Sequence, residues 1–176
     1  SQIEHGSKQF FEITPITYPV HTAIARASSI AKQKGVDINL TEDEDLYLLG
    51  DHIQITSAIY NLLDNAIKYT EEGTGKIDIT IQAKENNIEV MISDNGIGIP
   101  ESSHNRVFER FYRVDPSRSR ESGGTGLGLA IVRHVVLNHD GKISLDSKEG
   151  QGTSFTISLP QQKQDQIETN PTEVKV

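Results

Sequence analysis

Apolar residues that recur every three or four positions predict three helices in this chain. They recur between residues 21 and 34, just before a glycine, and again from Asp51, a residue type that caps helices, to about residue 69. Residues 128–138 predict a third helix by the same pattern. A shorter helix is expected at 106–111, between two glycine-rich loops.

Apolar and polar residues alternate in several other stretches, as they do in β-strands. Two hairpins are expected, one over residues 77–92 and one over residues 142–159, each interrupted by a polar turn. Shorter strands are expected at 10–13, 36–40 and 46–50. Helices combined with such strands predict an α+β fold, a two-layer α/β sandwich in which helices cover one face of a mixed, mostly antiparallel sheet.

The distribution of proline and of polar residues indicates where the folded domain lies. Pro15 and Pro19 favour an irregular segment over residues 1–19 with at most a short strand, and residues 1–13 of it are interpreted as a linker. Residues 14–160 form the expected domain, which is long enough to build a core without disulfides. The Gln-rich stretch 161–176 has too little apolar surface to fold and is expected to be a disordered polar tail.

Composition excludes several classes of function. The 176 residues carry 25 acidic and 17 basic side chains, a formal charge of −8. Such a surface repels phosphodiester backbones, so nucleic acid is not an expected partner, although local amides, a few cations and a metal ion can still hold a nucleotide. The absence of cysteine excludes disulfides and thiol catalysis. No stretch approaches the roughly 20 apolar residues of a membrane span, so no membrane contact is expected.

The second predicted helix has a polar face with candidate chemistry. At helical spacing Asn61, Asn65 and Lys68 share one arc, away from the apolar residues that explain core packing. Two carboxamides one turn apart and an ammonium suit a hydrated magnesium ion and phosphate oxygens. The alternative is an ordinary solvated face on which Asp64 and Lys68 form an ion pair four residues apart. Both interpretations stay open on this motif alone.

A second motif follows a predicted strand, at residues 94–100. Gly96 and Gly98 allow the backbone to approach a flat ligand closely. A carboxylate such as Asp94 at a strand end can accept a hydrogen bond from an exocyclic amine, and it discriminates well when it is buried. A tight turn rich in Asp, Asn and Gly is the equally weighted alternative.

A third motif is the glycine-rich run at 123–128, which opens the last predicted helix. Exposed amides at a helix start bind anions, and glycines permit close approach. The run is not a dinucleotide fingerprint, because Leu129 occupies the position of the third glycine, and it lacks the Gly-Lys-Ser/Thr end of a P-loop. A flexible linker is the alternative, but Leu127 and Leu129 between the glycines disfavour it.

Five arginines lie between residues 106 and 120 of this acidic chain. Arg106 and Arg110 are interpreted as solvated surface residues. Arg113, beside aromatic residues and before the glycine-rich run, is placed to reach a γ-phosphate and offset its charge. The six histidines show no metal-ligand spacing and receive no role.

In order and spacing, these motifs resemble the catalytic domain of bacterial two-component sensor histidine kinases. The matching segments are the N box at 61–69, the G1 box at 94–100, the F box at 107–113, the G2 box at 124–130 and a final glycine box at 150–155. The resemblance spans residues 14–160 and implies an ATP-binding sandwich of the type shared with gyrase and MutL ATPases. Within the family, residues 113–124 most resemble the phosphate-regulon sensor kinases of Gram-positive bacteria.

The resemblance implies a role for each matching residue. Asn65 would ligate Mg²⁺, Asn61 and Lys68 would hold phosphates, and Asp94 would bind the adenine amino group. Asn65, Lys68 and Arg113 would act in catalysis. The other expected nucleotide contacts, in the adenine pocket and in a lid over the triphosphate, are Tyr69, Gly96, Gly98, Ile99, Tyr112, Gly124, Thr125, Gly126, Leu127, Gly128, Leu129 and Thr153.

The implied enzyme is a protein histidine kinase that binds Mg·ATP and donates the γ-phosphoryl group to a histidine, from which a response-regulator aspartate receives it. The family's acceptor motif, a histidine and an acidic residue followed by Leu-Arg-Thr-Pro, does not occur in the sequence. We therefore expect a fragment whose acceptor and dimerisation helices lie on a separate domain joined through residues 1–13.

The fragment is expected to be monomeric and cytoplasmic, within a homodimeric parent anchored in the membrane. Two alternatives remain, an ATPase or chaperone-like motor of the same fold and a nucleotide-binding regulatory module without transfer chemistry. The F box disfavours the first, and Asn65 and Arg113 disfavour the second.

Overall fold

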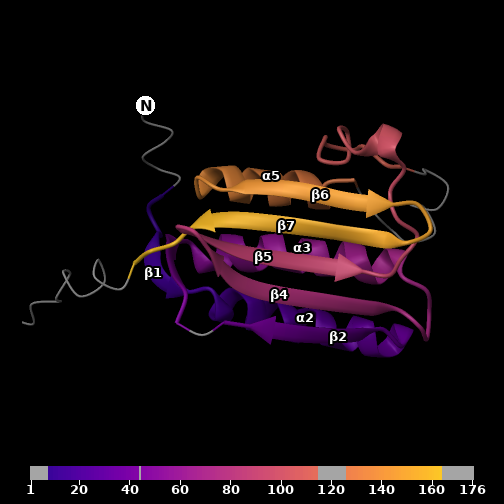
Figure 1. The fold of residues 1–176 in the computed structure, drawn as a ribbon, viewed down its shortest axis with the longest axis horizontal. Helices are drawn as coiled ribbons and strands as arrows, with labels where there is room; N and C mark the ends of the chain where they lie inside the picture. Colours follow the sequence, from indigo (N-terminus) through magenta and orange to yellow (C-terminus); the bar gives the residue numbers. More distant parts are fainter. Residues whose placement is uncertain (1–7, 44, 115–125, 164–176) are drawn as a thin grey trace, which may run out of the picture.

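The computed structural model of the protein describes residues 8–43, 45–114 and 126–163 (Figure 1). After β1, single helices alternate with pairs of strands along the described chain. In order, the elements are β1 (Glu12–Pro15), α2 (Thr17–Lys34), β2 (Asp37–Glu42), β3 (Tyr47–Gly50), α3 (His52–Tyr69), β4 (Lys76–Lys84), β5 (Asn87–Asp94), a 3₁₀ turn (Glu101–Ser103), α5 (Gly128–Asn138), β6 (Lys142–Lys148) and β7 (Gly152–Pro160).

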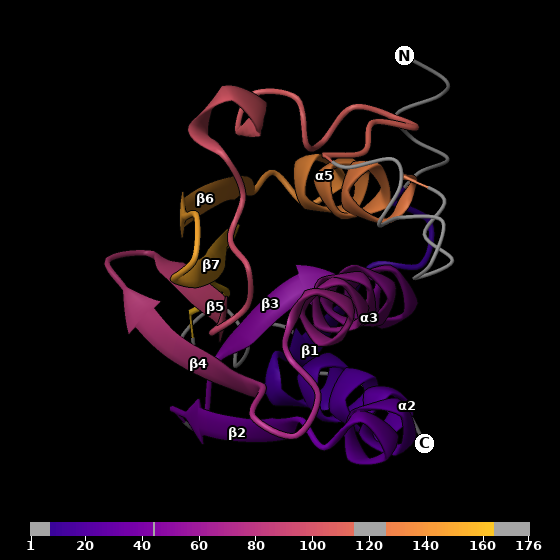
Figure 2. The same cartoon turned by 90° about the vertical axis from the view of Figure 1, so that its right-hand side faces the viewer.

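The main sheet has five strands in the order β2-β4-β5-β7-β6. β2 runs parallel to β4, and the other neighbours are antiparallel. β1 and β3 form a separate antiparallel pair. Figure 2 shows α2, α3 and α5 side by side on one face of the main sheet. The predicted two-layer α/β sandwich with a mixed, mostly antiparallel sheet is therefore confirmed.

The core lies between the helices and the inward-facing residues of the central strands. Ile77, Ile79 and Ile81 of β4, and Ile88, Val90 and Ile92 of the neighbouring β5, are all at most 2% exposed. Burying each of these isoleucines contributes about 1.5–3 kcal/mol. The predicted alternation is thus confirmed, and it fixes which face of the sheet the helices cover.

Both ends of α3 are held by side chains. At the start, Asp51 Oδ1 accepts hydrogen bonds from the amides of Ile53 (2.9 Å) and Gln54 (3.3 Å), as the predicted cap requires. At the other end, Lys34 Nζ of α2 donates to the carbonyls of Ile67 (2.6 Å) and Lys68 (2.9 Å). A cation at the carboxyl end of a helix also complements the helix dipole. The helix that carries the polar face is therefore anchored at both ends.

The prediction for the first 20 residues was partly wrong. The first strand occupies Glu12–Pro15 rather than 10–13, and α2 starts at Thr17, four residues earlier than expected. Pro19 is the third residue of α2, where the amide of an ordinary residue would have no partner within the helix. Proline therefore breaks no hydrogen bond there, and the sequence signal for an irregular segment was misleading.

The helix predicted at 106–111 is absent from the described structure. The chain instead forms the 3₁₀ turn Glu101–Ser103 and a series of turns in which the amides of Arg106 (3.0 Å) and Val107 (3.1 Å) both donate to the Ser103 carbonyl. Phe111 has a φ of 65°, which no right-handed helix accommodates. Local turns therefore replace a continuous helix.

Past β7, the backbone amide of Gln161 donates to Asn86 O (2.9 Å) and that of Gln162 to Tyr47 O (2.8 Å). Most of the predicted tail, from residue 164 on, and residues 1–7 of the predicted linker lie outside the described residues. The division into linker, domain and tail stays a prediction.

Candidate functional site

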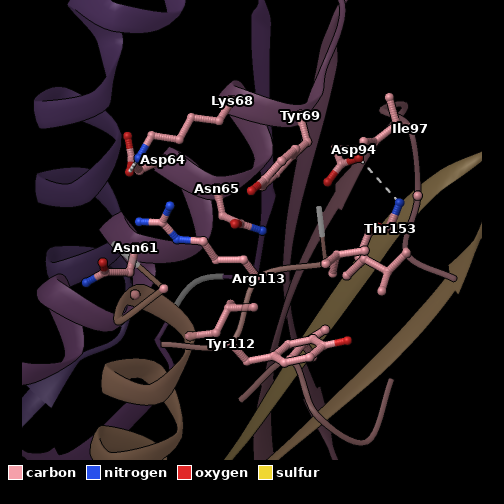
Figure 3. Close-up of a pocket in the computed structure, with 17 residues that line it drawn as sticks. Asn61, Asp64, Asn65, Lys68, Tyr69, Asp94, Ile97, Tyr112, Arg113 and Thr153 are labelled. Atoms are coloured by element: carbon pink, nitrogen blue, oxygen red, sulfur yellow. Dashed lines mark hydrogen bonds and ion pairs between the residues drawn. The ribbon is translucent and has the colours of Figure 1, made fainter. Parts of the chain in front are cut away.

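One cavity of the described structure is lined by most of the predicted site residues. It lies where α3 and β5 end and where β7 and α5 begin (Figure 3). The predicted residues that line it are Asn61, Asn65, Lys68, Tyr69, Asp94, Gly98, Ile99, Tyr112, Arg113, Gly126, Gly128, Leu129 and Thr153. Segments up to 92 residues apart in sequence thus converge on one place, as the motif analysis required.

Some residues do not follow the prediction. Gly96 and Leu127 are not among those that line the cavity, and Gly124 and Thr125 lie outside the described residues. The lining also includes four residues that were not predicted: Asp64, Ile97, Val107 and Val114. Asp64 had appeared only as a partner for Lys68, and the three apolar residues have the same sequence pattern as core residues.

The polar face of α3 borders one side of the cavity. Lys68 Nζ lies 2.9 Å from Asp64 Oδ2, so the ion pair considered as the alternative is present, and both side chains also line the cavity. Asn61 Nδ2 donates to Ser57 O (2.8 Å), which fixes the orientation of the amide. Figure 3 shows Asn61, Asn65 and Lys68 extending from the same side of the helix. The two interpretations of this face therefore coexist.

Asp94 stands at the opposite side, at the last position of β5. Its Oδ1 accepts from the backbone amides of Gly96 (2.9 Å) and Thr153 (3.3 Å). Burial raises the pKa of Asp94 above its ordinary value of 3.8, and the two backbone hydrogen bonds partly oppose that shift. A carboxylate accepts more than two hydrogen bonds, so Asp94 keeps capacity for a ligand donor.

Two glycines of the 94–100 loop bring its backbone against neighbouring segments. Gly98 has a φ of 74°, and a Cβ there would overlap the Lys148 carbonyl. A Cβ on Gly96 would overlap the carbonyl of Tyr69, to which the amide of Ile97 donates (3.1 Å). Gly96 therefore joins the loop to the end of α3 rather than lining the cavity.

The segment before residue 114 covers another side of the cavity. Tyr112 Oη lies 2.8 Å from Ser103 Oγ, and the guanidinium of Arg106 lies 4.6 Å from the Tyr112 ring centroid. Arg106, interpreted as a solvated residue, is more than half exposed but also stacks on this ring. Figure 3 shows Arg113 extending toward the α3 face that carries Asn61 and Asn65. The aromatic anchor is thus adjacent to the arginine, as predicted.

The start of α5 meets the polar face of α3. A Cβ on Gly128 would lie 3.1 Å from Asn61 Oδ1, so glycine permits this approach. The helix begins after Leu127 without a side-chain cap among the described residues. The start of α5 therefore borders the cavity, and the amides at a helix start suit an anion.

The donor set of the cavity suits a hard cation that arrives with a phosphate ligand. Asn61 and Asn65 offer neutral amide oxygens, which Mg²⁺ accepts as ligands. Within residues 8–43, 45–114 and 126–163, no three His, Asp or Glu side chains gather into a metal site. The residues present fit a metal whose remaining ligands are phosphate oxygens and water.

Comparisons with known proteins agree with this geometry. Residues 50–163 match the family described as histidine kinase-, DNA gyrase B-, and HSP90-like ATPase. The sensor-like histidine kinase SenX3 of Mycolicibacterium smegmatis is 44% identical over 142 residues, 81% of this chain and 37% of that protein. This chain therefore spans little more than a third of that relative's length.

Solved structures give the same result. The mycobacterial sensor histidine kinase MprB has a TM-score of 0.73 at 31% identity, over 86% of this chain and 98% of that one. Full-length ShkA, solved in complex with AMPPNP, has a TM-score of 0.75 at 25% identity, over 86% of this chain and 31% of that one. The similarity to MprB covers nearly that whole chain and most of this one.

Proposed function

Because the chain belongs to the family of histidine kinase-, DNA gyrase B- and HSP90-like ATPases, we propose that its cavity binds Mg·ATP and donates the γ-phosphoryl group to a histidine. The observation that carries the proposal is the separation of chemistry within one cavity. A half-buried carboxylate lies at one side, and amides, carboxamides and cations lie at the other. Such a pair of subsites matches a purine and a triphosphate.

At the purine side, Asp94 accepts a hydrogen bond from the exocyclic amine of adenine. Its position is fixed by the two backbone amides that it already binds. Ile97, Ile99 and Val107 supply the apolar walls against which a flat base packs. A base without the amine would leave the remaining acceptor sites of this half-buried carboxylate without a ligand donor, which is unfavourable.

At the phosphate side, Asn65 holds the magnesium ion, and Asn61 and Lys68 hold phosphate oxygens. The ion, when bound, neutralises charge on the β- and γ-phosphates during transfer. Lys68 exchanges part of its ion pair with Asp64 for the phosphate. Arg113 and the first amides of α5 complete the enclosure of the γ-phosphoryl group.

Phosphoryl transfer breaks the bond between the γ-phosphorus and the β,γ-bridging oxygen and forms a bond to an imidazole nitrogen. ADP leaves with the bridging oxygen. The residues of this chain orient the triphosphate and offset its charge, which supplies most of the rate in such reactions. The acceptor histidine belongs to a separate helical domain of the parent protein, and a response-regulator aspartate takes the group from it.

The names of the relatives favour this reaction over the two alternatives. SenX3 and MprB are sensor histidine kinases, and the complex of ShkA with AMPPNP supports an adenine nucleotide as ligand. A motor ATPase or a purely regulatory module would share the fold, but the relatives named here are sensor histidine kinases. The parent is proposed to be a membrane-anchored homodimer with this domain in the cytoplasm. Of the described helices, none has the length and apolar content to cross a bilayer.

The test is phosphotransfer to an acceptor domain supplied separately. The chain, labelled ATP and a dimerisation domain that carries the acceptor histidine are mixed, and acid-labile phosphate on the acceptor is measured. Asn65→Ala is expected to lower the rate at least about a hundredfold, because it removes a ligand of the metal. Asn39→Ala, on exposed strand β2, is the matched control and should keep the wild-type rate.

Without the acceptor domain, the chain is expected to carry no acid-labile label. Label on one of its own histidines would contradict the proposed division of donor and acceptor. ATP hydrolysis without transfer to any acceptor histidine would instead favour the motor ATPase.

A further inference from the structure

The inward-facing row of β6 ends in a serine. Ile143 and Leu145 of this strand pack against the core, and Ser147 occupies the next inward position, where the same pattern would place another apolar residue. Ser147 is half-buried beside Ile99 and Thr153, two residues that line the cavity. A serine at this inward-facing position therefore needs polar partners for its hydroxyl.

Three hydrogen bonds converge on the Ser147 hydroxyl. The amide of Ile99 donates to Ser147 Oγ (2.7 Å), and Ser147 Oγ donates to the carbonyl of Gly152 (2.9 Å). Thr153 Oγ1 lies 2.8 Å from Ser147 Oγ. The Ser147 hydroxyl has one proton, and a carbonyl oxygen can only accept. Ser147 therefore donates its proton to the Gly152 carbonyl. The proton between the two hydroxyls therefore comes from Thr153.

This arrangement makes Thr153 an acceptor toward the cavity. Its own proton is directed to Ser147, so only lone pairs remain for a ligand. Its neighbour Asp94, which accepts the Thr153 amide, is also an acceptor (Figure 3). A water between Asp94 and Thr153 would donate one proton to each of them. Its oxygen could then only accept a hydrogen bond from the ligand. The purine side of the cavity thus calls for a ligand that donates.

We propose that Ser147 is a positioning residue that sets the base preference of the cavity by holding the Thr153 proton, and so favours 6-aminopurine over 6-oxopurine nucleoside triphosphates. This inference rests on the proposed binding of Mg·ATP. A 6-amino group offers two N–H donors to the two acceptors, whereas a 6-oxo group places a third acceptor against them.

Removal of the Ser147 hydroxyl should release the Thr153 proton. In Ser147→Ala the Thr153 hydroxyl can rotate and donate to a 6-oxo oxygen, which relieves the repulsion. The preference for ATP over ITP, which differ at the 6-position and in the N1 proton that accompanies it, is expected to narrow about fivefold. A merely structural effect of the substitution would weaken both nucleotides by the same factor and leave their ratio unchanged.

The experiment is calorimetric titration of the chain with Mg·ATP and with Mg·ITP, in the wild type and three variants. Ser147→Ala is expected to reduce the ratio of ATP affinity to ITP affinity. Ser147→Thr, which keeps a hydroxyl, is expected to retain the wild-type ratio. Ser144→Ala removes a hydroxyl from the exposed face of the same strand and should change neither affinity. An unchanged ATP-to-ITP ratio in Ser147→Ala would overturn the inference.

A second variant decides the matter if Ser147→Ala does not fold. Thr153→Val removes the acceptor, so ATP should bind more weakly while ITP binds as well as before or better. A loss confined to ITP would mean that Thr153 donates, and would contradict the inference. The two proposals fail differently: a wild-type chain that does not bind Mg·ATP overturns the proposed function, whereas normal ATP binding with an unaltered ratio overturns only the role of Ser147.

Discussion

Two opposing effects act on the carboxylate of Asp94: burial disfavours its charge, and hydrogen bonds from the backbone favour it. Its carboxylate is buried enough that its pKa is raised, yet two backbone amides hold it in place for a ligand. Replacement of the charge by a neutral amide would remove the desolvation cost and could keep both backbone bonds. A residue whose ionised form is unfavourable for folding, but required for recognition of a donor, is characteristic of a binding site.

The raised pKa of Asp94 predicts a pH dependence of ATP affinity. The ionised carboxylate accepts more strongly from the adenine amine than the protonated acid does, so affinity should fall as the pH drops through a pKa above the ordinary 3.8. The contribution of Asp94 to the free energy of unfolding has the opposite pH dependence. The folded state binds this proton more tightly than the unfolded state does, so acidification removes the desolvation cost of the buried charge and stabilises the fold. Affinity measured by calorimetry between about pH 7.5 and 4.5 tests this.

Asp94→Asn is the reference for that measurement, because ATP itself also titrates in this range. The variant should bind ATP weakly at every pH and lack the additional acid step. Parallel pH profiles for wild type and variant would show that Asp94 does not control recognition.

Among the elements, α3 is the one on which the site depends most. Its start is capped by Asp51, and the amide of Asp51 donates to His139 Nε2 (3.0 Å) at the end of α5. His139 Nδ1 donates to Val135 O (2.8 Å), and its ring stacks on Phe11 at 4.5 Å between centroids. The histidine therefore joins α3, α5 and the segment before β1 at the end of the molecule opposite the cavity.

Burial lowers the pKa of His139, which predicts a loss of stability in acid. Protonation would place a proton on Nε2, directly against the Asp51 amide. The folded state binds fewer protons than the unfolded state below about pH 6.5, so the free energy of unfolding should fall there, by at most about 1.4 kcal/mol per pH unit. Above that pH the neutral His139 makes its full contribution to the free energy of unfolding.

Urea unfolding at pH 7.5 and 5.5 measures this dependence. His139→Gln should be less stable by about 2 kcal/mol at pH 7.5, because packing and a buried hydrogen bond are lost, and should show a smaller pH slope. His134→Gln, at an exposed position of the same helix, should keep the wild-type slope. Equal slopes in wild type and His139→Gln would contradict this account.

Regular elements could be predicted because their pattern repeats. The buried isoleucines of β4 and β5 and the start of α3 at Asp51 follow from periodicity and capping alone. Pro19 misled the prediction because its effect depends on its position within the first helical turn. The contact of Lys34 with the end of α3 joins residues more than 30 positions apart, which no local pattern encodes.

For the whole molecule, the site forms because four element ends meet. α3 and β5 end where α5 and β7 begin, so the residues of three separated motifs face one cavity. Motif chemistry predicted most of the polar lining. It could not predict Ile97, Val107 and Val114, because an apolar residue that lines a cavity has the same sequence signature as one in the core.

Under the proposed function the chain alone is expected to be incomplete as a kinase, because the family's acceptor motif does not occur in the sequence. In the proposed reaction the cavity provides for binding and for charge neutralisation, and another part of the parent protein supplies the acceptor imidazole. The match to little more than a third of SenX3 is consistent with such a division. Donor and acceptor halves can therefore be studied separately and then combined.

Calorimetric titration of the chain with Mg·ATP tests the central claim most directly. The wild type is expected to bind one nucleotide, and Asp94→Ala is expected to bind at least about a hundredfold more weakly while circular dichroism shows an intact fold. Asp78→Ala, at an exposed position of β4, is the control and should bind as the wild type does. Absence of binding heat in the wild type, or unchanged affinity in Asp94→Ala, would contradict the account.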